Sequence, residues 1–96
     1  MKYDLEVKDE ANSETIEAYL YYEEKRIGLG EAFLEHLETY FDRITANPEH
    51  FPLKRKPYRE AFIKRFPFLI VYEIDKNKVI VYSVFNTWQN PEKKTK

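Results

Sequence analysis

The sequence predicts a small single-domain α+β protein, with a two-helix hairpin packed on a curved, mainly antiparallel sheet in the order β-α-α-β-β-β. Three observations predict this fold class. An alternating apolar and polar segment opens the chain, two amphipathic helical segments follow, and the last third holds two apolar runs around a polar turn. The chain has 96 residues, which suits one domain with one core. We expect that domain to cover residues 1–91, followed by a polar tail over residues 92–96.

A strand is expected first, because Tyr3, Leu5 and Val7 alternate with charged residues. The first helix is expected to begin at Asn12 or Ser13, since both residue types are good N-caps. It should run to about residue 27. The residues spaced to line its buried face are Ile16, Tyr19, Leu20 and Ile27.

The acidic residues of this helix have two expected roles. Glu14 and Glu17 would lie in the first turn, where negative charge complements the helix dipole. The pair Glu23-Glu24 is interpreted as part of a solvated helix face. Gly28 suits the left-handed backbone position that ends a helix, so we expect a tight link to the next helix.

The second helix has the clearest pattern in the chain. Its apolar residues repeat at intervals of three and four, which predicts one continuous buried face. These residues are Phe33, Leu34, Leu37, Tyr40, Phe41 and Ile44. Asn47-Pro48 should end the helix, because the residue before a proline is pushed out of the α region.

Three strands are expected after this helix. A loop and the basic segment 54–59 lead to a strand near residues 58–66, and Pro67 should mark a strand break, a bulge or an edge. The apolar runs that begin at Phe68 and Val79 then form a hairpin around the polar turn at residues 75–78. The first hairpin strand is apolar on both faces, as in a central strand of a small sheet.

Charge is divided between the two halves of the chain. Residues 1–50 carry 5 Lys or Arg against 13 Asp or Glu, whereas residues 51–96 carry 11 against 4. This asymmetry favours a basic face that meets an anionic partner. The alternative is that the halves fold against each other and their charges mix as ordinary solvated surface.

Several classes of protein are disfavoured by composition. The chain has no cysteine, which excludes disulfides, thiolate metal sites and thiol nucleophiles. His36 and His50 are expected to be surface imidazoles, and no histidine or carboxylate spacing indicates a metal site, so we expect no metal and no cofactor. No apolar run approaches the length of a membrane span and no signal segment is evident, so we expect a cytoplasmic protein that does not bind membranes.

Several pieces of the sequence occur in an order typical of one family. They are Ala18-Tyr19-Leu20-Tyr21-Tyr22, Gly28-Leu29-Gly30 with Phe33, Asn47-Pro48, Arg59 on a strand, Phe66-Pro67-Phe68 with Tyr72, and Asn90-Pro91. In this order and spacing the chain resembles the RelE/ParE superfamily of type II toxins, which includes plasmid stabilisation proteins. The resemblance covers nearly the whole chain.

The resemblance implies a toxin that arrests growth and is neutralised by a cognate antitoxin protein. Members similar to RelE are mRNA interferases, which cleave messenger RNA on the ribosome. Members similar to ParE bind and poison DNA gyrase and are not enzymes. A third reading is a catalytically inactive protein of this fold, which only engages its antitoxin or another macromolecule. The resemblance does not decide among these mechanisms or fix the oligomeric state.

The candidate catalytic residues are Arg59, Asn86 and Gln89. The resemblance places Asn86 and Gln89 where many relatives have a histidine and an arginine, and Leu69 where RelE-like enzymes often have another arginine. Asparagine cannot shuttle a proton near neutral pH, and glutamine lacks the cationic fork of arginine. We therefore expect RNA cleavage to be weak or absent, although the basic residues keep an endoribonuclease reading open.

The candidate residues for binding RNA or a protein partner form a basic and aromatic set. They are Lys54, Arg55, Lys56, Tyr58, Arg65 and Trp88. Lysine and arginine can hold phosphates, and an exposed aromatic ring can stack on a base or anchor an interface. The alternatives are a solvated loop and edge strand protected by charge for residues 54–56, and a lid over the core edge for Trp88.

Overall fold

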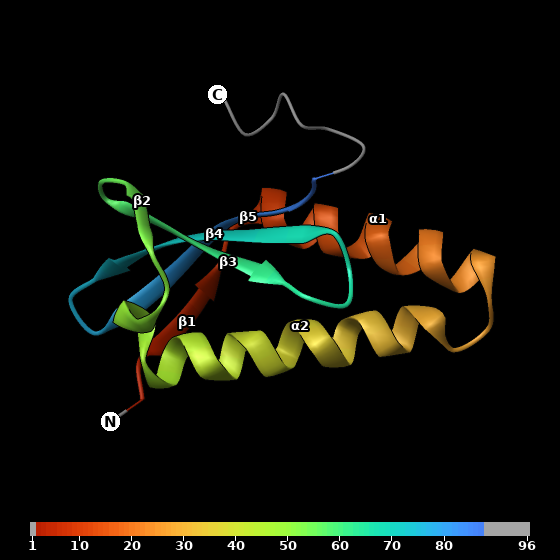
Figure 1. Ribbon diagram of the computed structural model, residues 1–96, viewed down its shortest axis with the longest axis horizontal. Coiled ribbons are helices and arrows are strands. Elements are labelled where there is room, and N and C mark those ends of the chain that lie inside the picture. Colours follow the sequence, from red (N-terminus) through yellow and green to blue (C-terminus); the bar gives the residue numbers. More distant parts are fainter. Residues whose placement is uncertain (1, 88–96) are drawn as a thin grey trace.

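A computed structural model describes residues 2–87 (Figure 1). The elements are β1 (Asp4–Val7), α1 (Asp9–Lys25), α2 (Leu29–Ala46), the 3-10 helix η1 (Pro48–His50), β2 (Leu53–Arg55), β3 (Tyr58–Ile63), β4 (Phe68–Asp75) and β5 (Lys78–Asn86). The strands form one sheet in the order β1-β5-β4-β3-β2, in which β1 is parallel to β5 and the other pairs are antiparallel. The predicted fold class and element order are confirmed, with β2 as an additional short strand.

The core lies between α2 and the face of the sheet that the helices cover. Phe33, Leu37 and Ile44 of α2 are at most 3% exposed, as the apolar repeat predicts. They belong to one cluster with Ile70 and Tyr72 of the central strand β4. The helix ends at Ala46, directly before Asn47-Pro48, so the predicted stop is confirmed.

The predictions for the start and the buried face of α1 were wrong. The helix begins at Asp9 with Lys8 in the N-cap position, because the chain passes from β1 into the helix without a loop. The buried residues of the helix are the small Ala11 and Ala18, which allow it to approach its neighbours closely, and the partly buried Tyr22 also packs against the core. The side chains of Ile16, Leu20 and Ile27 are instead 59%, 59% and 91% exposed.

The link between the helices depends on two glycines and one carboxylate. Gly28 has φ 92°, so the predicted left-handed backbone is confirmed. A Cβ atom on Gly30 would lie 2.7 Å from the Tyr19 carbonyl oxygen, so only glycine permits this helix contact. The Glu23 carboxylate accepts hydrogen bonds from the Gly28 and Gly30 amides at 2.9 and 3.0 Å, so it caps α2 and is not merely part of a solvated face.

Glu14 also has a role that the sequence did not predict. A bulge leaves Tyr82 as an extra residue on β5, between the pairs Tyr72–Val81 and Val71–Ser83. Because β1 pairs with β5 only as far as Val81, the next part of this edge has no partner strand among residues 2–87. The Glu14 carboxylate lies there and accepts hydrogen bonds from Ser83 Oγ and the Val84 amide, both at 2.9 Å.

The connections at the two ends of β4 follow the sequence signals. Pro67 lies between β3 and β4, so the predicted strand break is confirmed. At the other end, Asp75 pairs with Lys78 across a two-residue turn. Lys76 has φ 58° in this turn, the positive φ that primed hairpin turns need at their first central residue.

Truncation of Leu37 to alanine tests the predicted core. The substitution should lower the free energy of unfolding by about 2–5 kcal/mol, because it leaves a cavity between α2 and the sheet. The exposed neighbour Glu38 provides the control, since Glu38→Ala should change that free energy by less than about 0.5 kcal/mol. Urea unfolding measures both effects, and equal effects of the two substitutions would contradict the assigned helix face.

The ionisation of Tyr72 provides a test at high pH. Burial raises the pKa of Tyr72 from its ordinary value of 10.0 to about 12, although the nearby Arg59 charge acts in the opposite direction. The unfolded chain therefore ionises this phenol first, and the associated stability is present below pH 10 and is lost as the pH rises towards about 12. Unfolding free energies measured across this range should fall more steeply for the wild type than for Tyr72→Phe. Parallel pH profiles would rule out this burial effect.

Candidate functional site

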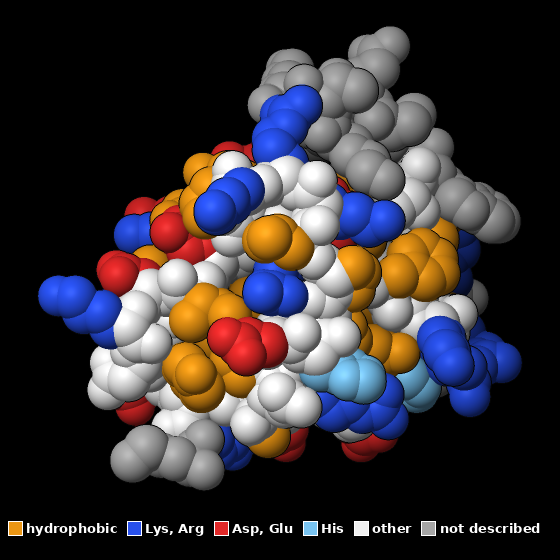
Figure 2. All heavy atoms as spheres, turned by 60° about the vertical axis from the view of Figure 1, so that its left-hand side comes forward, with side chains coloured by type: hydrophobic (Ala, Val, Ile, Leu, Met, Phe, Trp, Pro, Cys, Tyr) orange, Lys and Arg blue, Asp and Glu red, His pale blue; other side chains and the backbone are white. Residues whose placement is uncertain are grey.

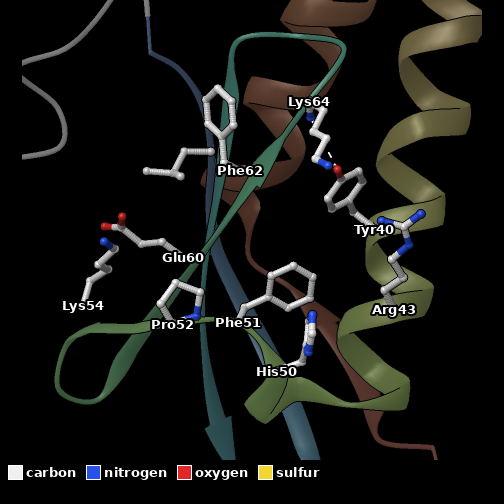
Figure 3. A pocket seen from close by; sticks show the side chains of 10 residues that line it. Tyr40, Arg43, His50, Phe51, Pro52, Lys54, Glu60, Phe62 and Lys64 are labelled. Carbon is white, nitrogen blue, oxygen red and sulfur yellow. Dashed lines mark hydrogen bonds between the residues drawn. The ribbon is translucent and has the colours of Figure 1, made fainter.

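A pocket of about 440 Å³ lies beside the outer edge of β3 (Figure 3). Its walls come from the C-terminal half of α2, from η1 and the segment that leads into β2, from β2, β3 and β4, and from the start of the β3–β4 turn. The lining residues are Tyr40, Arg43, His50, Phe51, Pro52, Lys54, Glu60, Phe62, Lys64 and Leu69. The pocket therefore reaches around the sheet edge, from the helix-covered face to the opposite face.

Cationic and aromatic side chains surround this pocket. Arg43, Lys54 and Lys64 carry positive charge, and Glu60 is the one acidic residue among those that line the pocket. Lys54 and Glu60 point towards each other in Figure 3. The Arg43 guanidinium lies 5.0 Å from the centre of the Tyr40 ring, and the Tyr40 hydroxyl accepts a hydrogen bond from the Lys64 amide at 3.4 Å. The pocket thus offers positive charge next to an apolar wall.

The edge of β3 beside the pocket is only partly covered. The three-residue strand β2 pairs with Tyr58 and Arg59, and the Pro52 carbonyl accepts a hydrogen bond from the Glu60 amide at 3.2 Å. Within residues 2–87, no strand pairs with this edge beyond that point. Phe62, in the uncovered part, has 54% of its surface exposed.

Arg59 holds the loop that follows α2. It is paired with Tyr72 of β4, and its Nη1 atom donates to the Phe51 carbonyl at 2.7 Å and to the Glu49 carbonyl at 3.3 Å. The Tyr72 hydroxyl donates to the Pro48 carbonyl at 2.5 Å. These bonds give the Arg59 side chain a structural role, which the family pattern did not indicate.

Four of the predicted binding residues lie close together in the chain. Lys54 and Arg55 are on β2, Lys56 is in the turn that follows, and Tyr58 begins β3. All four are exposed. The Tyr58 ring also packs edge-on against Tyr82 at 5.6 Å. On the side of the molecule that holds the β2–β3 turn, Figure 2 shows Lys and Arg side chains interspersed with hydrophobic ones.

Among the described residues, Arg65 and Asn86 are not brought to this group. Arg65 is exposed in the β3–β4 turn, at the opposite end of β3. Asn86 is the last residue of β5 and pairs with Phe68, which is four residues from Tyr72 on β4. Arg59 and Asn86 are therefore offset by about 13 Å along the strand direction. Trp88 and Gln89 lie outside the described residues.

The sequence interpretation missed part of the pocket. Arg43 was not singled out because a helix pattern does not show which sheet edge the helix crosses. Phe62 gave a usable signal, since it alternates with the buried Ala61 and Ile63 and so points to the face away from the helices. His36 was expected at the surface, but it is half-buried, with its ring 5.5 Å from that of Phe66.

Two further properties concern residues 2–87 alone. None of the helices in this part of the chain is long and apolar enough to span a membrane. The same residues contain no group of three or more histidine or acidic side chains arranged to hold a metal ion.

Comparison with known proteins gives a family and a fold. The family model of the ParE toxin of type II toxin–antitoxin systems, parDE, matches residues 5–91. A solved structure titled "Chromosomal ParDE TA system from P. aeruginosa" is similar, with a TM-score of 0.77 and 10% identity over 88% of this chain and 96% of that chain. No curated protein matches the sequence. Because the family model covers nearly the whole chain, the protein belongs to the ParE toxin family of type II toxin–antitoxin systems.

Proposed function

We propose that this toxin acts by binding DNA gyrase, not by cleaving RNA, and that a cognate antitoxin neutralises it. The family assignment supports a toxin, and the sequence resemblance associates ParE-like members with gyrase. The observation that carries the choice of mechanism is the separation of Arg59 from Asn86, together with the hydrogen bonds of Arg59 to the loop after α2.

RNA cleavage requires several groups in one place. A base must take the proton of the attacking 2′-hydroxyl, an acid must protonate the leaving oxygen, and cations must stabilise the charge on phosphorus. Asn86 cannot exchange a proton at neutral pH, and it lies about 13 Å along the sheet from Arg59. Arg59 already donates to the Phe51 and Glu49 carbonyls. This arrangement favours binding over acid–base chemistry.

The exposed residues around the β2–β3 turn suit a macromolecular target. Arg55, Lys56 and Tyr58 are exposed and adjacent. Arginine and tyrosine are enriched in protein interfaces, where they combine apolar contact area with hydrogen-bond donors. Lysine and arginine would also favour a target that carries DNA, since they neutralise phosphates. We assign this turn as the surface that contacts the gyrase–DNA complex.

Two parallel assays test the mechanism. The purified toxin should inhibit supercoiling by gyrase and should leave messenger RNA intact on translating ribosomes. The double substitution Arg55→Glu and Lys56→Glu should weaken gyrase inhibition about tenfold or more, because it reverses charge at the proposed contact. Lys76→Glu, in the exposed β4–β5 turn, is the control and should leave inhibition unchanged.

Codon-dependent RNA cleavage by the unmodified protein, without an effect on gyrase, would overturn this proposal. If the double variant inhibits gyrase as strongly as the wild type, gyrase remains the target. The β2–β3 turn is then not part of the contact surface. Co-expression with the neighbouring gene tests neutralisation, since the antitoxin should co-purify with the toxin and should restore supercoiling.

Replacement of Arg59 separates a structural from a catalytic role. Arg59→Ala should lower the free energy of unfolding by about 1.5–3 kcal/mol, the usual range for hydrogen bonds from a charged group. Arg55→Ala, an exposed residue on β2, should change it by less than about 0.5 kcal/mol. Denaturant unfolding gives both values. An Arg59→Ala protein of unchanged stability that loses an RNA-cleaving activity would assign a catalytic role to this residue instead.

A further inference from the structure

We propose that the outer edge of β3, from Ala61 to Lys64, accepts an extended acidic segment of the antitoxin as an additional strand. This inference rests on the proposed function for the identity of the partner. The added segment would lie in line with β2, because β2 covers only the start of β3. Its side chains would enter the pocket beside Arg43 and Lys64.

The backbone of β3 presents the required hydrogen-bonding groups. Its Glu60 amide points outward to Pro52, and the Lys64 amide points outward to Tyr40. Because backbone groups alternate in direction along a strand, the Phe62 amide and carbonyl face the same outer edge. No strand within residues 2–87 pairs with them. An extended peptide can satisfy both groups, which is how strand addition supplies affinity.

The two faces of this edge determine which side chains the segment should carry. Phe62, with 54% of its surface exposed, and Leu69 line the side away from the helices. Tyr40 and Arg43, from α2, line the helix side. Successive side chains of an added strand point to opposite faces. A segment that alternates apolar and acidic residues would therefore place its apolar groups on Phe62 and its carboxylates near Arg43.

Charge favours an acidic partner over a second copy of this chain. Arg43, Lys54 and Lys64 face the pocket, and Glu60 is the acidic residue that lines it. Edge-to-edge pairing of two copies would bring two such cationic edges together, and the like charges would repel. An acidic segment gains attraction at the same positions. Exposed Phe62 on an open edge is also a hazard for association that a bound strand would remove.

Hydrogen exchange on the complete toxin, alone and in complex with its antitoxin, tests the strand addition. The Phe62 amide should exchange at least about tenfold more slowly in the complex, because a partner carbonyl would accept its hydrogen bond. Arg43→Glu and Lys64→Glu should each weaken antitoxin binding about tenfold or more, and less so at high salt. Lys76→Glu makes the same charge change in the β4–β5 turn and should leave the affinity unchanged.

The outcomes distinguish this inference from the proposed function. If the antitoxin binds but Phe62 exchange and the affinities of both charge variants are unchanged, the strand addition is wrong and neutralisation stands. If the antitoxin does not bind the wild-type toxin, both proposals fail. Protection of Phe62 that grows with toxin concentration in the absence of antitoxin would identify a second copy as the occupant and would also overturn the inference.

Discussion

Three backbone carbonyls after α2 connect the helical layer to the sheet, and two strand side chains hold them. Tyr72 donates to the Pro48 carbonyl, and Arg59 donates to those of Glu49 and Phe51. The bond to the Pro48 carbonyl is buried, where an unpaired polar group would be costly, whereas those to the Phe51 and Glu49 carbonyls are part-buried and exposed, respectively. The loop leads directly into β2 and forms one wall of the pocket. The geometry of the whole β3 edge therefore depends on this small network.

The network also explains why a residue of the family pattern need not be catalytic. Arg59 and Tyr72 are paired across β3 and β4, so they lie beside each other and reach the same loop. An arginine that is required for folding and one that is required for chemistry look alike in a sequence. In this protein exposed cations are found at the β2–β3 turn and around the pocket, among other places. These two groups are the ones that we propose for contact with other macromolecules.

The sequence predicted the elements whose signals are local and strong. The apolar repeat of α2 and the hairpin of β4 and β5 are examples, and Gly28 and Asn47-Pro48 correctly marked the two ends of α2. The predicted buried face of α1 was wrong. The small Ala11 and Ala18 are buried against the core, whereas the larger Ile16, Leu20 and Ile27 are exposed. The roles of Glu14 and Glu23 could not be predicted, since their partners are determined by a bulge and by a helix crossing. The pocket depends in the same way on the position of α2 relative to β3.

The carboxylate of Glu14 has a consequence for how the sheet can associate with other chains. It occupies the β5 edge beyond β1, and β1 itself has only four residues, two of them the acidic Asp4 and Glu6. This side of the sheet therefore resists the approach of an extended chain, whereas within residues 2–87 no strand covers β3 beyond the part that pairs with β2. A short edge strand with charged side chains resists pairing with a further copy of the chain, so growth of the sheet from the β1 side is disfavoured.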